Sequence, residues 1–213
     1  RRFRDLPNII WVAGGDWVPP EADRWTATEV IEGILEEDPS HLVTYHASRG
    51  IPGAAHFGDQ PWLTVNTAYT GEKDAARLML AEYARRPVRP YVLIEAIYEG
   101  EHNATPELLR RQSYGAMLCG ACGQFLGTNP TWHFDGPGLY PVKVTWQEAL
   151  DGPGSRDMTR LRDLFARLPW HQLVPDTERA LVAGGLGEGS AAVLAAVTPD
   201  RRLAVAYIPS TGR

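Results

Sequence analysis

The sequence predicts an α/β fold with parallel strands, followed by a smaller antiparallel β region. Over residues 1–175, short apolar runs alternate with segments whose apolar residues recur at helical spacing. Because strand–helix–strand units close by right-handed crossovers, the strands of this region are expected to pair in parallel. Beyond residue 175 the chain changes to glycine-punctuated runs rich in alanine and valine. We therefore expect two domains, residues 1–175 and residues 176–213.

Five apolar runs supply the strands of the first domain. Residues 8–15 (NIIWVAGG) form a continuous apolar run closed by glycines, which is typical of a strand buried on both faces. Residues 90–97 (PYVLIEAI) form a second such run, interrupted by the single carboxylate of Glu95. The other expected strands are residues 41–46, 62–69 and 123–127.

Helices are expected between these strands. Residues 24–37 carry apolar side chains at i, i+3, i+4, i+7 and i+8, the pattern of a helix packed on a sheet. Thr105 followed by Pro106 predicts an N-cap and first helical position, with the helix running to about residue 119. Residues 72–83 and 157–168 are the remaining expected helices.

The second domain is expected to be the beginning of an antiparallel, β-sandwich-like fold. Its predicted strands are residues 180–186, 190–198 and 202–208, with a turn at Pro199 and Asp200. We expect this domain to be incomplete where the sequence stops at Arg213.

The parallel strands could form an open sheet or part of a barrel. An open, doubly wound sheet usually carries a glycine-rich phosphate loop after its first strand, but Gly14 and Gly15 are followed by Asp16. A complete (β/α)8 barrel takes about 250 residues, whereas residues 1–175 supply five strands. We therefore expect strands 4 to 8 of a TIM (β/α)8 barrel, with the upstream part of the barrel missing from this chain.

Composition argues against several function classes. The chain has 21 Lys and Arg against 26 Asp and Glu, a net charge of −5, so we expect neither nucleic acid nor a membrane as partner. The histidines lack metal-ligand spacing, and no G-x-S-x-G elbow lies in an α/β context. Cys119 and Cys122 follow an expected helix instead of opening one, which argues against a redox pair. We expect no metal and no cofactor.

Asp16 and Glu95 are the candidate catalytic residues because each lies where a buried strand ends, the position at which barrel enzymes present their reactive groups. Two carboxyl groups across a cleft, one protonated and one ionised, can cleave the acetal bond between sugars. In the structural alternative, Asp16 caps a turn and Glu95 pairs with an arginine such as Arg89. Glu99 and Glu101 are rivals for the nucleophile, although a solvated loop explains them more simply.

Other candidates would hold a sugar. Flat aromatic surfaces suit its C–H faces, and Tyr98, Trp132 and Trp17 could supply them. His46 and Asn66 lie near the ends of expected strands and could orient the sugar or a carboxylate. Packing in the core or at the barrel rim is the alternative for each of these residues.

Several motifs follow one another along the chain. They are residues 8–16 (NIIWVAGGD), 44–46 (TYH), 62–66 (WLTVN), 95–99 (EAIYE), 110–114 (RRQSY), Trp132, 146–150 (WQEAL), 152–154 (GPG), 168–170 (LPW) and 175–176 (PD). Their order resembles that of the apiosidase-like glycoside hydrolases. The resemblance covers nearly the whole chain and includes a C-terminal β module, which in that family is labelled a collagen-binding domain.

This resemblance implies a (β/α)8 barrel in which residues 8–15 form the fourth strand and residues 90–95 the seventh. It further implies that Asp16 is the general acid/base and Glu95 the nucleophile. The sequence departs from the family after Glu95, where proline is more usual, in residues 68–71 (AYTG) and at its two cysteines. These departures bear on the identity of the substrate more than on the type of reaction.

We therefore expect a glycoside hydrolase that cleaves a plant-type or other complex polysaccharide by a retaining, two-carboxylate mechanism. The alternatives are a non-catalytic module that binds a glycan or a protein and an open-sheet α/β enzyme of another kind. The family resemblance also implies export, as a secreted or periplasmic bacterial enzyme.

Overall fold

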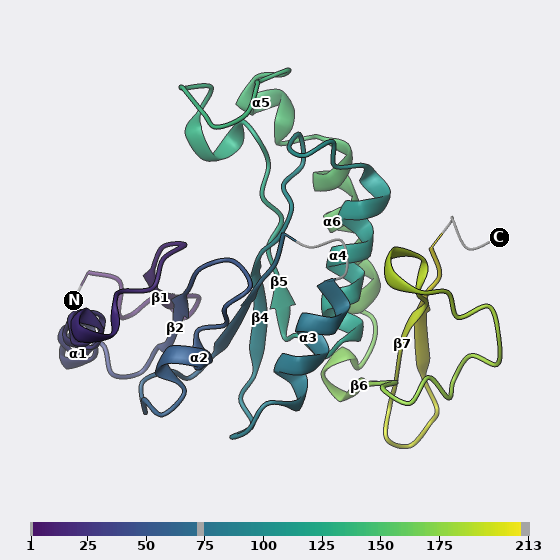
Figure 1. Ribbon diagram of the computed structural model, residues 1–213, viewed down its shortest axis with the longest axis horizontal. Helices are drawn as coiled ribbons and strands as arrows, with labels where there is room; N and C mark the ends of the chain where they lie inside the picture. The colour runs from purple at the N-terminus through teal and green to yellow at the C-terminus, as the bar shows by residue number, and fades with distance from the viewer. Residues whose placement is uncertain (1, 72–74, 210–213) are drawn as a thin grey trace.

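The computed structural model describes residues 2–71 and 75–209 and contains two parallel sheets (Figure 1). Strand β1 (Ile10–Gly14) pairs with β2 (Leu42–His46), while β3 (Asn66–Tyr69), β4 (Tyr91–Glu95) and β5 (Gly123–Gln124) form the second sheet in that order. The two sheets meet where the Thr67 hydroxyl donates to the Tyr45 carbonyl at 2.8 Å. Each parallel strand in the described part of the chain therefore neighbours the next one in sequence. This confirms the expected α/β class with parallel strands.

Helices cover one side of these strands. Helix α1 (Trp25–Glu37) packs through Ile31 against β1 and β2, whose residues Val43 and Tyr45 are buried in the same cluster. Helices α3 (Ala75–Ala84) and α4 (Pro106–Leu118) pack behind β3 and β4 around a second cluster, which includes Leu93. The Thr105 hydroxyl accepts the Leu108 N–H, which confirms the expected N-cap of α4.

The opposite side of the strands is open. Ile10 and Val12 are each 50% exposed and Leu42 is 47% exposed, and they line an apolar groove of about 670 Å³ together with Val92 and Ile94. The expectation that residues 8–15 are buried on both faces is therefore wrong, because α1 covers only one face of β1. An open, doubly wound sheet would have helices on both faces, so this geometry does not support the open-sheet alternative.

Several element boundaries differ from those expected. Strand β3 begins at Asn66, because residues 62–65 form a turn and an irregular segment before it. The first three residues of the expected helix 72–83 lie outside the described residues. Helix α6 (Pro153–Phe165) begins four residues earlier than expected, with proline in its first turn. The short helices are α2 (Ala54–Phe57), α5 (Trp146–Ala149) and the 3-10 turns Glu21–Asp23, Thr131–His133, Trp170–Gln172 and Gly189–Ala191.

A separate antiparallel sheet follows the parallel strands. It consists of β6 (Val174–Pro175), β7 (Leu194–Val197) and β8 (Ala204–Tyr207), so the expected strand at residues 180–186 is wrong. In Figure 1, α4 and α6 lie between this sheet and the parallel strands. The buried Arg111 guanidinium donates to the carbonyls of Gly189 and Ala192, which fixes the connection before β7 to α4. The division at residue 175 stays a prediction.

Candidate active site

The carboxyl ends of the parallel strands meet at one edge, and Glu95 is the central acid there. Glu95 is the last residue of β4, and His46 is the last residue of β2. The His46 Nε2 atom lies 2.9 Å from Glu95 Oε2. In the strand register Glu95 pairs with Tyr69, the last residue of β3. Two of the predicted site residues, Glu95 and His46, are therefore in contact, although they are 49 positions apart in the sequence.

Three side chains hold the Glu95 carboxylate in its charged form. Burial works to raise the pKa of Glu95, but hydrogen bonds from His46, Tyr98 and Tyr69 outweigh it and lower the pKa below its usual value. Burial in turn raises the pKa of Tyr98, and the negative charge of Glu95 adds to the rise. Burial also raises the pKa of Tyr69, so both tyrosine hydroxyls stay protonated and donate hydrogen bonds to the ionised Glu95 carboxylate.

Arg89, the alternative partner of Glu95, lies at the other end of β4. Arg89 precedes β4, and its guanidinium donates to the Gly58 carbonyl at 2.7 Å, at the opposite end of the strand from Glu95. The structural alternative of a Glu95–Arg89 pair is therefore wrong.

Asp16 stands at the same edge of the sheet as Glu95. It comes two residues after the end of β1, has a positive φ of 59° and is exposed. Burial raises the pKa of Tyr69, and the negative charges of both Glu95 and Asp16 contribute to that rise. The charges of both predicted catalytic carboxylates thus contribute in the same direction to the pKa of Tyr69. Their assignment as a catalytic pair stays a prediction.

Arg49 and Tyr69 are site residues that the sequence reasoning missed. The Arg49 guanidinium lies 3.4 Å from the Tyr69 hydroxyl and 5.5 Å from the centre of its ring. The hydrogen bond with Tyr69 raises the pKa of Arg49, and the charge of Asp16 contributes. One signal was available, because Tyr69 belongs to residues 68–71, the stretch that departs from the family pattern. Arg49 follows β2 in a turn that carries no sequence signal.

The aromatic candidates occupy different positions. Tyr98 is half-buried and hydrogen-bonds Glu95, so its hydroxyl is engaged with the carboxylate. Trp132 is 46% exposed, and its indole N–H donates to Glu101 at 3.2 Å. Trp17 is more exposed still, and its carbonyl accepts the hydroxyl of the buried Tyr45. Trp132 is therefore the platform candidate that combines a hydrogen-bonded N–H with a large exposed surface.

Asn66 lies away from this group. It is the first residue of β3 and pairs in register with Tyr91, the first residue of β4, so it marks the amino ends of the strands. Its buried amide donates to Glu82 at 2.7 Å and accepts the Ala54 N–H at 2.8 Å. The expectation that Asn66 faces the sugar is wrong. Strand β3 begins at Asn66 and not at residue 62, so Asn66 lies at the end of the strand opposite to Glu95.

The rival acids are not in a solvated loop. Glu99 is partly buried, and one of its oxygens accepts the N–H of Gly154 at 2.8 Å in the first turn of α6. Glu101 is only 8% exposed. The solvated-loop explanation is therefore wrong for both, because the connection between β4 and α4 folds back toward α6 and the segment after β5.

A family model described as the apiosidase-like catalytic domain matches residues 1–172. The chain belongs to this apiosidase-like family. The family expectation raised by the motif order is thus confirmed, and it covers the whole of the parallel sheets and the edge at which Glu95 and Asp16 lie.

Solved glycoside hydrolases share the fold of this apiosidase-like chain. One described as a glycoside hydrolase has a TM-score of 0.80 and 28% identity, with coverage of 92% of this chain and 51% of the other. A glycoside hydrolase family 5 protein from Bacteroides vulgatus ATCC 8482 has a TM-score of 0.79 and 29% identity, covering 92% and 49%. The chain therefore spans about half the length of these two structures. No curated protein gives a significant match.

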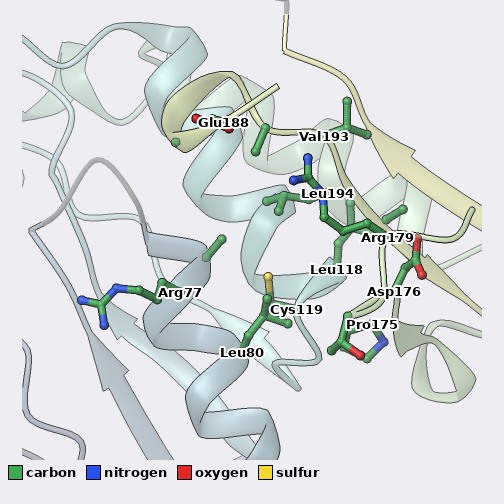
Figure 2. A pocket seen from close by; sticks show the side chains of 15 residues that line it. Arg77, Leu80, Leu118, Cys119, Pro175, Asp176, Arg179, Glu188, Val193 and Leu194 are labelled. Carbon is green, nitrogen blue, oxygen red and sulfur yellow. The ribbon is translucent and has the colours of Figure 1, made fainter. Parts of the chain in front are cut away.

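The apiosidase-like chain also has a cavity away from the edge that carries Glu95. A cavity of about 480 Å³ lies between α3, the end of α4 and the antiparallel sheet, and Figure 2 shows Arg77, Arg179 and Asp176 at its wall. Glu95 is not among the residues that line this cavity.

No group of three His, Cys, Asp or Glu side chains that could hold a metal ion occurs over residues 2–71 and 75–209. Over the same residues, no helix is long and apolar enough to cross a membrane.

Proposed function

We propose that this apiosidase-like chain carries the catalytic edge of a retaining glycoside hydrolase. The observation that carries the proposal is the ionised Glu95 carboxylate, held by His46, Tyr69 and Tyr98 at the carboxyl end of β4. A carboxylate fixed in its charged form is what a nucleophile needs, because protonation would remove the lone pair that attacks. Asp16 is exposed at the same edge, where substrate and water can reach its carboxyl group.

The proposed reaction has two steps. A Glu95 oxygen forms a bond to the anomeric carbon while the glycosidic C–O bond breaks, and Asp16 gives its proton to the leaving oxygen. In the second step Asp16 takes a proton from water as the water oxygen attacks the anomeric carbon and Glu95 departs. The sugar leaves with its original anomeric configuration, and both carboxyl groups return to their starting states.

We also propose that the five parallel strands are strands 4 to 8 of a (β/α)8 barrel. The support is their sequential order, the helices along one side and the apolar groove along the other, which would be the interior of a closed barrel. The remaining strands would come from an upstream part of the same polypeptide. A carboxyl-end site is where barrel enzymes hold their catalytic residues, so Asp16 and Glu95 fit this architecture.

The proposed substrate is a plant-type or other complex polysaccharide. Trp132 offers an exposed aromatic surface for a sugar ring, and Trp17, the residue after Asp16, offers another. Arg49 adds a positive charge that faces both Tyr69 and Asp16 and can donate hydrogen bonds to sugar oxygens.

The test is turnover by the full-length protein on a panel of aryl glycosides and plant polysaccharides. Glu95→Gln should lower kcat by about 10⁴-fold or more, as is usual when a nucleophile is removed. Glu32→Gln, on the exposed side of α1, is the matched control and should turn over at the wild-type rate. A Glu95 variant with substantial activity would refute the proposal. Glycan binding without hydrolysis by the wild type would favour the non-catalytic binding module.

A further inference from the structure

The connection between β4 and α4 buries one carboxyl group that the proposed reaction does not use. Glu101 comes six residues after Glu95 and is 8% exposed. The turn that carries it is tight, because Gly100, His102 and Asn103 all have positive φ values and the Ala104 N–H donates to the Glu101 carbonyl at 2.7 Å. A buried acid costs free energy unless it is hydrogen-bonded, so its partner is informative.

The partner of Glu101 is the indole of Trp132, which comes from a different part of the chain. The Trp132 N–H donates to Glu101 Oε1 at 3.2 Å. The centres of the Trp132 and His133 rings lie 4.6 Å apart in a T-shaped contact, and His133 Nε2 lies 2.7 Å from Asn129 Oδ1. The indole is thus held by Glu101 and His133, while 46% of the Trp132 surface stays exposed.

Glu101 is connected to Glu95 through Tyr98. Burial raises the pKa of Glu101, and the negative charge of Glu95 adds to the rise, while the Trp132 hydrogen bond and the charges of His102 and His133 work against it. The Glu101 N–H donates to the Tyr98 carbonyl at 3.3 Å, and the Tyr98 side chain hydrogen-bonds Glu95, so one residue connects the two acids. His102 itself is held by a 2.7 Å contact with the Tyr140 hydroxyl, which ties the turn to the segment after β5 a second time.

A fixed orientation suits an exposed tryptophan to a ligand that lies flat against its ring. Its single polar atom is already engaged with Glu101, so the ring face is what remains for a ligand. Sugars present C–H faces of this kind, and a ring that is already oriented loses less conformational entropy when it binds them. The contact with Glu101 therefore orients the exposed indole relative to the turn that follows β4.

We propose that Glu101 is a positioning residue, which fixes the Trp132 indole beside Glu95 as the platform for the sugar that is cleaved. This inference rests on the proposed glycoside hydrolase function for its substrate class. Glu101 takes no part in bond making, so its removal acts through Trp132 and weakens sugar binding more than it slows the chemical step.

The test measures sugar affinity in variants of the full-length protein on an array of immobilised plant-polysaccharide oligosaccharides. Glu101→Leu should weaken binding about tenfold, because one hydrogen bond and the orientation that it fixes are lost. Glu101→Gln keeps an oxygen that can accept the indole N–H and should restore most of the affinity. Trp132→Phe keeps an aromatic face without the N–H and should resemble Glu101→Leu.

The double variant Glu101→Leu/Trp132→Phe decides whether the two residues act together. If Glu101 works through the indole, the double variant should bind no more weakly than Trp132→Phe alone. Losses that multiply would show that Glu101 acts independently and would overturn the proposal. A melting temperature within about 3 °C of the wild type is required of each variant, so that the comparison concerns folded protein.

The same measurements separate this inference from the proposed reaction. If no substrate is hydrolysed but array binding still depends on Glu101 and Trp132 as described, the reaction fails and the platform stands. If hydrolysis depends on Glu95 but Glu101→Leu leaves both affinity and KM unchanged, the reaction stands and the platform fails. A wild-type protein that binds no oligosaccharide on the array would overturn the platform.

Discussion

The open face of the parallel strands should make this 213-residue chain associate with itself. Ile10, Val12 and Leu42 stand side by side on β1 and β2, each about half exposed, and line the apolar groove of about 670 Å³. Val12→Lys places a charge in the middle of this face. The matched control is Val88→Lys, because Val88 is 72% exposed in the loop before β4 and is not among the residues that line the groove.

The magnitude follows from the exposed halves of the three side chains. Fully burying one such residue contributes about 1.5–3 kcal/mol, so covering the exposed half of all three contributes roughly 3 kcal/mol per face. A lysine buried in the same contact would lose solvation that the partner face cannot replace, which costs several kcal/mol. Val12→Lys should therefore raise the dissociation constant for self-association by about 100-fold or more.

The assay is size-exclusion chromatography with light scattering over a range of protein concentrations, together with the fluorescence of a hydrophobic dye. The wild type and Val88→Lys should associate at the higher concentrations and bind the dye, whereas Val12→Lys should shift toward monomer and bind less dye. A wild-type chain that stays monomeric and binds no dye would refute the reasoning, because it would show that the groove is not a free apolar surface in solution.

Three further predictions concern individual networks. Asn66→Ala should lower the free energy of unfolding, measured by urea denaturation, by about 2–4 kcal/mol, because the buried Glu82 carboxylate loses a hydrogen-bond donor. A decrease of less than about 0.5 kcal/mol would contradict a structural role for Asn66. His46→Ala removes a hydrogen bond that lowers the pKa of Glu95, so the acid limb of the pH profile of kcat/KM should move to higher pH. An acid limb that does not move would argue against Glu95 as the ionised nucleophile. Burial works to raise the pKa of Asp38, but hydrogen bonds to its carboxylate outweigh burial and lower the pKa from 3.8 to about 2. The contribution of Asp38 to the free energy of unfolding should therefore be present above pH 3.8 and disappear as the pH falls to about 2. Asp38→Asn should remove this acid-dependent part of the denaturation profile, and an unchanged profile would contradict the assignment.

Hydrophobic periodicity predicted the elements whose packing is local. The apolar run before Gly15 and the spacing around Ile31 each reflect one face that must be buried, so β1 and α1 lie within two residues of their expected bounds. Thr105 and Pro106 predicted the start of α4 because capping depends on adjacent residues. The burial of β1 could not be predicted in the same way, because it depends on what covers the second face.

The site was predictable where a residue ends a strand and not where a loop folds back. Glu95 and His46 end β4 and β2, so the shared edge of a parallel sheet brings them together. Asn66 was misplaced because a strand boundary shifted by four residues moves a side chain to the other end of the sheet. The contact of Glu101 with Trp132 depends on positive φ values in the turn before α4, which no periodicity records.

The identity of the nucleophile is the central claim, and covalent trapping tests it most directly. The full-length protein would be incubated with an activated 2-deoxy-2-fluoro glycoside of its substrate, which slows the second step and lets the glycosyl-enzyme accumulate, and the label would be located by peptide mass spectrometry. The account predicts one sugar per chain, attached to the peptide that contains Glu95 at that residue. A label on Glu99 or Glu101, or turnover with inversion and no adduct at all, would contradict it.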